Sequence, residues 1–195
     1  MNVYDFDKTI CSKDSAVEFF KHCLKKYPKI ITILPNLASH YIQQKRNKIS
    51  RATLKTSLYQ YLKYVDDIEQ EAKIFWDENM HLIQPWYLNQ KRKDDLIASA
   101  SPEFLIKEIC QRLEVNWLAS PLNLETLSYD GINNWGSEKV RRFYEAYPDG
   151  YIEKFYSDHL SDSPLAKIAM EAYLVEGDKI KPWPIKDLVE DKYYQ

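Results

Sequence analysis

The sequence predicts an α/β fold: a parallel sheet flanked by helices, with a long all-helical segment inserted after the first strand. Three observations predict it. The chain begins with a short apolar strand candidate that stops near Phe6 and ends in two carboxylates, Asp5 and Asp7. Residues 11–87 show helical spacing of apolar positions and no strand pattern. From Asp94 onward, short apolar runs alternate with helical segments, which is typical of parallel strands joined by right-handed crossovers.

Length and composition fit one globular domain with room for a small insert, since the chain has 195 residues and is 45% hydrophobic. The three cysteines, Cys11, Cys23 and Cys110, form no Cys-x-x-Cys pair, so a reduced, cytoplasmic setting is expected. The first predicted strand starts at the initiator methionine, so no signal peptide is expected. No run of apolar residues is long enough to span a membrane.

The net charge of −2 hides an uneven distribution. Residues 21–55 carry nine Lys or Arg and no Asp or Glu, so the remainder of the chain is acidic. A basic segment can attract phosphate groups or an anionic membrane surface. It is also typical of a solvated helix face, and that interpretation is slightly favoured.

Four helices are expected within residues 11–87. Residues that cap or open helices mark their starts: Asp14 or Ser15, Pro28, Ser50, and Asp66 or Asp67. The second helix is unusually apolar between Ile30 and Ile42, and Pro35 should kink or break it. Core packing accounts for most of the other apolar positions.

Strands and helices alternate in the second half. Strands are expected at 96–99, 115–119, 152–157 and 173–175. Ser101-Pro102-Glu103 should start the helix after the first of these, because proline is favoured at the first helical position. Further helices are expected from the cap residue Ser137 and over 164–170. Residues 122–134 are interpreted as a hairpin with Asp130-Gly131 in its middle, and the tail around 182–184 is expected to pack loosely.

Polar residues follow the ends of the predicted strands. They are Asp5 with Asp7, Ser99, Lys139, and Asp158 with Asp162. Residues i and i+2 of a strand point the same way, so Asp5 and Asp7 should share the carboxyl edge of the sheet, where open α/β sheets bind ligands. Two carboxylates this close repel, and a divalent cation usually keeps both ionised. Each residue alone has an ordinary explanation as a cap, a turn or a solvated side chain, but together they favour an active site.

These residues resemble the four motifs of the haloacid dehalogenase superfamily of aspartate-nucleophile phosphatases. The motifs are Asp5-Phe6-Asp7-Lys8-Thr9, Leu96-Ile97-Ala98-Ser99, Lys139, and Asp158 with Asp162. The segment 131–140 is similar to the one leading into the lysine of the phosphoserine-phosphatase-like branch, subfamily IB. The resemblance implies a Rossmann-like catalytic core of residues 1–10 and 88–195. It also implies an inserted all-helical cap domain of residues 11–87.

The resemblance assigns roles to the site residues. Asp5 would be the nucleophile that forms an aspartyl-phosphate, and Asp7 would protonate the leaving oxygen and then activate water. Ser99 and Lys139 would bind the phosphoryl oxygens. The true dehalogenases do not need the second acid, so Asp7 argues for phosphate-ester chemistry.

The resemblance also implies a Mg²⁺ cofactor. It would be held by the Asp5 carboxylate, the Asp7 backbone carbonyl and Asp158, and it would keep several waters. Asp162 would support the metal shell or orient Lys139. The four histidines show no ligand spacing, so zinc is not expected.

The implied function is Mg²⁺-dependent hydrolysis of a phosphomonoester, either a small phosphorylated metabolite or a phospholipid head group. These two substrate classes are those of the phosphoserine phosphatases and of phosphatidylglycerophosphatase-like relatives, which this chain resembles. The phosphoserine enzymes carry Ser-Gly-Gly at the second motif, whereas this chain has Ser99-Ala100-Ser101, which puts phosphoserine in doubt. Asp14 matches in spacing an acid that those enzymes use for the substrate amine, but it fits a helix cap at least as well.

Two alternatives stay open. One is a non-catalytic membrane-surface or binding module that retains the fold, and the other is phosphoryl transfer to an acceptor other than water. The apolar, basic cap could contact an anionic membrane peripherally. No nucleic-acid partner is expected, because no recognised binding module accompanies the basic and aromatic residues.

Overall fold

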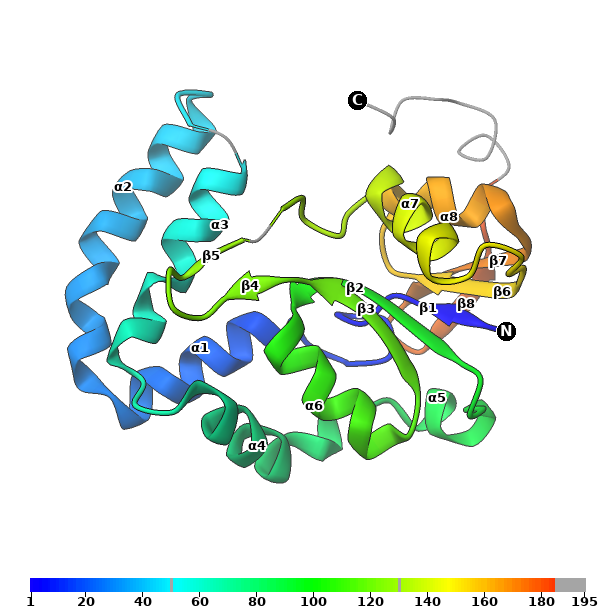
Figure 1. The fold of residues 1–195 in the computed structure, drawn as a ribbon, viewed down its shortest axis with the longest axis horizontal. Helices are drawn as coiled ribbons and strands as arrows, with labels where there is room; N and C mark the ends of the chain where they lie inside the picture. The colour runs from blue at the N-terminus through cyan, green and yellow to red at the C-terminus, as the bar shows by residue number, and fades with distance from the viewer. Residues whose placement is uncertain (50, 130, 185–195) are drawn as a thin grey trace.

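The computed structural model describes residues 1–49, 51–129 and 131–184, with the backbone alone at 51, 52 and 55 (Figure 1). A six-stranded sheet has the strand order β3-β2-β1-β6-β7-β8. Its strands are β1 (Val3–Tyr4), β2 (Leu96–Pro102), β3 (Asn116–Ser120), β6 (Ile152–Ser157), β7 (Ala169–Glu176) and β8 (Lys179–Pro182). All neighbours pair in parallel except β7 and β8, which are antiparallel. The prediction of a mainly parallel sheet flanked by helices is confirmed.

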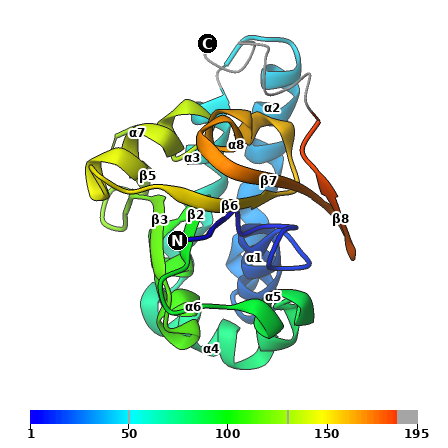
Figure 2. The ribbon, with the colours of Figure 1, turned by 90° about the vertical axis from the view of Figure 1, so that its right-hand side faces the viewer.

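Helices cover both faces of the sheet. The α-helices are α1 (Ser15–Lys26), α2 (Leu34–Lys45), α3 (Arg51–Tyr59), α4 (Ile68–Asn79), α5 (Pro85–Gln90), α6 (Glu103–Leu113), α7 (Ser137–Ala146) and α8 (Ser163–Ile168). Short 3₁₀ helices are η1 (Pro28–Ile33), η2 (Gln60–Tyr64), η3 (Met80–Leu82) and η4 (Leu160–Asp162). In Figures 1 and 2, α7 and α8 lie on one side of the sheet, and α4 and α6 lie on the other.

The strand residues alternate between two cores. Val3 of β1 packs in a core that includes Phe143 of α7 and Leu165 of α8. Its neighbour Tyr4 packs in the larger core, which includes Phe19 of α1 and other side chains of α4 and α6. This alternation follows from the pleat, which points successive side chains to opposite faces. The short β1 is therefore buried on both sides, as expected for the central strand of a three-layer fold.

The segment between β1 and β2 is helical throughout its described elements. It contains five α-helices and three 3₁₀ helices, not the four helices expected. Pro35 lies in the first turn of α2, so the predicted break falls just before it, where η1 ends at Ile33. Aromatic residues of α1 and α4 share one core with the sheet. The division of residues 11–87 from the sheet as a cap domain stays a prediction.

Several predicted boundaries in the second half were wrong. The strand after Asp95 runs on to Pro102, so α6 begins one residue later than expected. The hairpin consists of β4 (Leu122–Asn123) and β5 (Ser128–Tyr129), so its turn lies before Gly131 and not in the middle of 122–134; Asp130, which was expected in the turn, lies outside the described residues. Ser137 is the first residue of α7, whose N-cap is Gly136 with a φ of 60°. Only the β6 range of 152–157 agrees to the residue.

The tail is more ordered than expected as far as it is described. The chain returns antiparallel to β7 as β8, an element that was not predicted. Trp183 is buried, and its ring centroid lies 5.8 Å from that of Phe155 in β6. The backbone N–H of Trp183 donates to the carbonyl of Ala172 at 2.8 Å. The expectation of loose packing is therefore wrong at this residue.

No described helix is both long and apolar enough to cross a membrane. The three cysteines are buried and unpaired with one another. Burial raises the pKa of each thiol. They therefore behave as small apolar core residues.

Asp95, at the start of β2, gives a stability prediction. Burial raises the pKa of its carboxyl from 3.8 to about 6, and its Oδ1 has no partner among the described residues. Because the folded pKa lies above the unfolded one, wild-type stability should fall as pH rises through about 6. Between about pH 4 and about pH 8, the free energy of unfolding of Asp95→Asn should gain about 1–2 kcal/mol relative to wild type.

Urea unfolding of both proteins at several pH values checks this prediction. The quantity to compare is how the difference in free energy of unfolding between Asp95→Asn and wild type changes with pH. The difference at a single pH is not enough, because the new amide alters hydrogen bonding at every pH. Asp94→Asn is the matched control, since Asp94 is exposed and pairs with Arg92 at the surface. A pH-independent difference between Asp95→Asn and wild type would contradict the prediction.

Candidate active site

The loop after β1 sets the positions of the first two acids. The backbone N–H of Asp5 donates to Tyr156 O at 2.8 Å, which extends the pairing with β6 by one residue. The chain then turns sharply: Lys8 has a φ of 58°, and the Cys11 N–H returns to Phe6 O at 2.9 Å. The buried Phe6 side chain anchors the turn in the core. Asp5 and Asp7 therefore lie at the carboxyl edge of the central strand, as their spacing predicted.

Five of the six predicted site residues meet in one pocket of about 300 Å³. The pocket is lined by Asp5, Asp7, Lys8, Asp14, Ala100, Trp135, Lys139, Asp158, His159, Ser161 and Asp162. It lies where β1 has β2 on one side and β6 on the other. A switch of this kind leaves a crevice beyond the strand ends, the usual ligand site of open α/β sheets.

Ser99 is the predicted residue that does not line the pocket. It is fully buried, and its Oγ accepts a hydrogen bond from the backbone N–H of Ser101 at 3.0 Å. Ala100 lines the pocket in its place.

Lys139 holds two carboxylates together. Its Nζ lies 2.7 Å from Asp5 Oδ1 and 2.6 Å from Asp162 Oδ2, and its side chain is only 2% exposed. Burial alone would lower the pKa of Lys139, but Asp162 and Asp5 raise it above its ordinary value. Ser157 donates a further hydrogen bond to Asp162 Oδ2 at 2.8 Å. The lysine is thus a permanent buried cation at the edge of the sheet.

The pocket carboxyls carry more negative charge than Lys139 neutralises. Burial is the largest cause that raises the pKa of Asp5, to about 7, against the opposing effect of Lys139. Burial and the neighbouring Asp14 raise the pKa of Asp7, and burial raises that of Asp158. Such crowding is relieved by a bound proton or a cation.

The donor set suits a hard cation. All the acids that line the pocket offer oxygen, and Asp162 Oδ1 is buried without a partner among the described residues. Within the same residues, no group of three or more His, Cys, Asp and Glu side chains could hold a metal ion. A cation would therefore take few side-chain ligands and complete its shell with backbone oxygens and waters. Mg²⁺ is bound in this way more often than in all-protein cages.

Asp7 is fixed through both of its oxygens. Oδ1 accepts from the backbone N–H of Ser15 at 2.6 Å, at the start of α1. Oδ2 lies 2.5 Å from the Ser101 hydroxyl, at the end of β2. A hydroxyl can donate to a carboxylate or accept from a protonated acid, so Ser101 can serve Asp7 in both protonation states.

The structure adds two residues that hold the site together. The buried Thr9 hydroxyl accepts from the backbone N–H of Asp158 at 2.9 Å, which joins the loops after β1 and β6. The buried amide of Asn134 donates to Ser99 O at 3.1 Å and Leu118 O at 2.8 Å. It thereby ties β2 and β3 to the loop that leads into Lys139. Both residues stand within segments singled out from the sequence, but their bonds span distances that no local pattern shows.

Asp14 and His159 each have a structural role and also line the pocket. Asp14 caps α1, because its Oδ1 accepts from the Val17 N–H at 3.0 Å. The Ser161 N–H donates to His159 Nδ1 at 3.0 Å, which fixes that ring beside Asp158. The cap interpretation of Asp14 is confirmed, and a contact with substrate stays a prediction.

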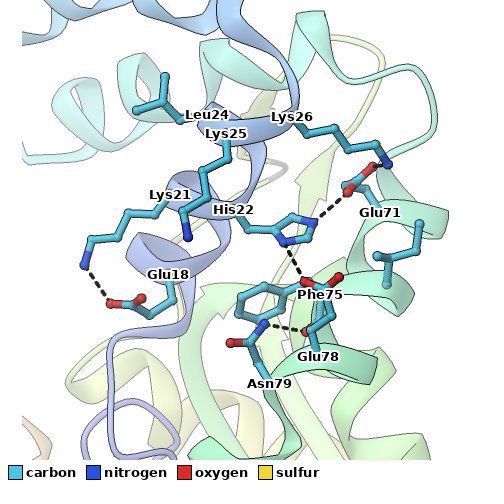
Figure 3. A pocket seen from close by; sticks show the side chains of 11 residues that line it. Glu18, Lys21, His22, Leu24, Lys25, Lys26, Glu71, Phe75, Glu78 and Asn79 are labelled. Carbon is cyan, nitrogen blue, oxygen red and sulfur yellow. Dashed lines mark hydrogen bonds and ion pairs between the residues drawn. The ribbon is translucent and has the colours of Figure 1, made fainter.

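A second polar hollow lies between α1 and α4, away from the strand ends (Figure 3). His22 Nε2 and Lys26 Nζ each lie 2.6 Å from a carboxylate oxygen of Glu71, and Tyr27 donates to it at 2.8 Å. Burial alone would raise the pKa of Glu71, but these hydrogen bonds lower it overall. The buried charge is thus neutralised by its neighbours, and the network ties α1 to α4.

The fold and the pocket together indicate a hydrolase, and the comparisons with known proteins agree. Residues 3–167 match the family model of haloacid dehalogenase-like hydrolases, so the chain belongs to that family. The prediction of a hydrolase of this superfamily is confirmed. Subfamily IB stays a prediction. The search of curated proteins gave no match.

Solved structures share the fold at low identity. A protein of unknown function from Bordetella pertussis Tohama I has a TM-score of 0.70 and 14% identity, over 88% of this chain and 87% of that chain. A phosphoserine phosphohydrolase-like protein from Francisella tularensis subsp. tularensis SCHU S4 has a TM-score of 0.51 and 19% identity, over 88% and 86%. A HAD family hydrolase from Salmonella enterica subsp. enterica serovar Typhi has a TM-score of 0.55 and 13% identity, over 86% and 59%. At these identities the likeness concerns the fold.

Proposed function

We propose that the chain is a Mg²⁺-dependent phosphomonoester hydrolase that acts through an aspartyl-phosphate. The observation that carries the proposal is the buried Lys139 Nζ, which lies 2.7 Å from Asp5 and 2.6 Å from Asp162 in the pocket that the second acid, Asp7, also lines. A lone structural ion pair would not need a second carboxylate facing the same pocket. A nucleophile, a proton donor and a fixed cation in one crevice are what phosphoryl transfer requires.

The proposed reaction has two steps. In the first, an Asp5 carboxylate oxygen forms a bond to phosphorus, the ester P–O bond breaks, and the leaving oxygen takes the proton of Asp7. In the second, Asp7 takes a proton from water, which attacks the phosphorus and releases phosphate and the Asp5 carboxylate. The raised pKa of Asp7 supports its role as the acid, because it favours the protonated form that donates the proton.

Lys139 and Ser99 are proposed to bind the phosphoryl oxygens. Lys139 would offset the negative charge of the transferring group at the point where it approaches Asp5. The bond from the Ser101 N–H uses only a lone pair of Ser99 Oγ, so the Ser99 O–H can still donate. Asp162 is proposed to orient Lys139 through their 2.6 Å contact and to support the metal shell.

Mg²⁺ is proposed to be held by the carboxylates of Asp5 and Asp158 and by the backbone carbonyl of Asp7. When bound, it would neutralise charge on the phosphoryl group and on the crowded acids. The position of Asp158 supports this assignment, because its loop is tied to the Asp5–Asp7 loop through Thr9.

The architecture in this proposal is that of subfamily IB: residues 11–87 form a helical cap over a core of residues 1–10 and 88–195. The insertion of the helices between β1 and β2 supports it. The proposed substrate is a small phosphorylated metabolite or a phospholipid head group, and the proposed location is the cytoplasm. Peripheral contact with an anionic membrane stays a prediction. The complete set of site residues favours an enzyme over a non-catalytic module.

Phosphate release tests the proposed function. The purified protein is incubated with sugar, nucleotide, amino-acid and alkyl phosphates, with Mg²⁺ or with a chelator. Release that needs Mg²⁺ is the expected result. Folded protein that releases no phosphate from any of them with Mg²⁺ present would contradict it.

Ser101→Ala tests the positioning of Asp7. Losing the hydroxyl should lower kcat about tenfold, because Asp7 would lose one of its two fixing contacts. The Ser101 hydrogen bond lowers the pKa of Asp7, so its loss should move the basic limb of the kcat–pH profile to higher pH. The measurement is kcat against pH, with Ser128→Ala on β5 as the control that leaves the profile unchanged. A slower Ser101→Ala with an unshifted basic limb would argue against contact with the acid.

A further inference from the structure

An apolar groove adjoins the proposed catalytic pocket. It has a volume of about 1020 Å³ and is lined by Val17, Leu34, Leu37, Ala38, Tyr41, Leu54, Leu58, Ala100, Asn133 and Trp135. Ala100 and Trp135 line the catalytic pocket as well. The two hollows therefore meet at these side chains. The rest of a molecule whose phosphate lies beside Asp5 can extend directly into the groove.

The lining shows what chemistry the groove suits. It contains no Asp, Glu, Lys or Arg, and its side-chain polar groups are the Asn133 amide, the Tyr41 hydroxyl and the indole N–H of Trp135. Asn133 is engaged already, since Ser120 Oγ donates to its Oδ1 at 2.8 Å. A charged or sugar-like group placed there would lose its hydration and find few hydrogen-bond partners, whereas an alkyl chain would gain by leaving water.

Large apolar side chains that line the groove are exposed to water. Tyr41 is 52% exposed and Trp135 is 39% exposed, and α2 has no buried residue along its length. Contiguous exposed apolar surface of this kind usually marks a binding site. In Figure 1, α2 and α3 stand together at one end of the molecule, and the segment before α7 runs from their side toward α7.

We propose that this groove binds the leaving group of the substrate, which is a phosphate monoester of an alcohol bearing a long alkyl chain. The inference rests on the proposed function, because the phosphate must lie beside Asp5 for the alkyl chain of the substrate to reach the groove. Its basis is the shared lining by Ala100 and Trp135. The volume agrees with a ligand site, since such sites span roughly 300–1,000 Å³. Leu37 and Leu58 are then specificity-determining residues.

Binding of an alkyl phosphate series tests the groove without hydrolysis. Ethyl, butyl, hexyl and octyl phosphate are titrated calorimetrically into Asp5→Asn protein with Mg²⁺, each below the concentration at which it aggregates. Kd should fall by about twofold to about fourfold per added methylene, the upper value corresponding to 0.8 kcal/mol at 298 K. Wild-type kcat/KM should follow the same order.

Leu37→Asn in the Asp5→Asn background is the groove variant, and Ile42→Asn is its matched control. Ile42 lies on the same helix and is 50% exposed, but it does not line the groove. Leu37→Asn should reduce the ratio of the ethyl Kd to the octyl Kd by about tenfold, and Ile42→Asn should leave it unchanged. Thermal unfolding of each variant shows whether it is folded, and Leu58→Asn replaces Leu37→Asn if that protein unfolds.

The outcomes separate the two proposals. A Kd that does not change with chain length, or a ratio insensitive to the groove variants, overturns the groove. Binding that strengthens with the length of the alkyl group, together with no phosphate release by wild type, supports the groove and contradicts the proposed hydrolysis. A chain-length effect that occurs only when the alkyl phosphate is embedded in phosphatidylglycerol vesicles would indicate adsorption to a membrane surface and also overturns the groove.

Discussion

Replacing Asp5 with asparagine should abolish phosphate release, with kcat at least about 10³-fold below wild type. The amide is a poor nucleophile toward phosphorus, so the first step of the proposed reaction cannot proceed. The protein should stay folded, because Lys139 keeps its partner Asp162 at 2.6 Å. The measurement is phosphate release with the best substrate of the panel, together with thermal unfolding.

Asp94→Asn is the control for this prediction. Asp94 is exposed, pairs with Arg92 and lies outside the catalytic pocket. It should release phosphate at the wild-type rate. A folded Asp5→Asn protein with a rate within about tenfold of wild type would remove Asp5 from the reaction and with it the proposed mechanism.

Lys139→Met should lower both stability and activity. It leaves the buried Asp5 and Asp162 without their shared cation, and removing one partner of a buried ion pair costs about 3–5 kcal/mol. Lys139 opposes the rise that burial causes in the pKa of Asp5, so without the lysine this pKa moves further above its unfolded value. The lost stability should therefore be largest above neutral pH and smallest where the acids are protonated. The rate should fall at least about 10²-fold, because the transferring group loses a fixed positive charge.

Urea unfolding at about pH 5 and about pH 8 checks the stability part of this prediction. Lys154→Met is the control: Lys154 is exposed and lies 3.6 Å from the exposed Glu171, so its loss should change little. Adding Asp162→Asn to Lys139→Met should restore part of the stability and none of the rate. Unchanged stability of Lys139→Met at about pH 8 would show that the buried charges are compensated in another way.

The sequence predicted what depends on local periodicity. Asp5 and Asp7 were placed at the sheet edge by the alternation of a strand, and β6 by a short apolar run. Lys139 and Asp162 were singled out by their place after predicted strands and given roles by the family resemblance, and the structure brings them together. The carboxyl ends of parallel strands share one edge, so residues that follow different strands meet there without any local signal.

Long-range packing decided what the sequence did not predict. Asp130-Gly131 favours a turn, but the hairpin turns earlier, where Leu127 takes a φ of 52° and is buried in the core. Burying that side chain outweighs the local turn preference of a glycine. Trp183 gave no periodic signal because it is a single residue that packs on Phe155. The contact between the groove and the pocket also depends on tertiary structure, since Val17, Leu58 and Trp135 are distant in the chain.

Detection of phosphoryl-Asp5 tests the central claim most directly. The Asp7→Asn protein is incubated with Mg²⁺ and an aryl phosphate, whose leaving group needs little help from an acid, and is quenched in acid. Peptide mass spectrometry should find one phosphoryl group on Asp5, because the first step proceeds while hydrolysis is slowed. Rapidly quenched wild type serves as the comparison. Phosphate release by wild type with no phosphoryl group on Asp5 in either protein would contradict the account.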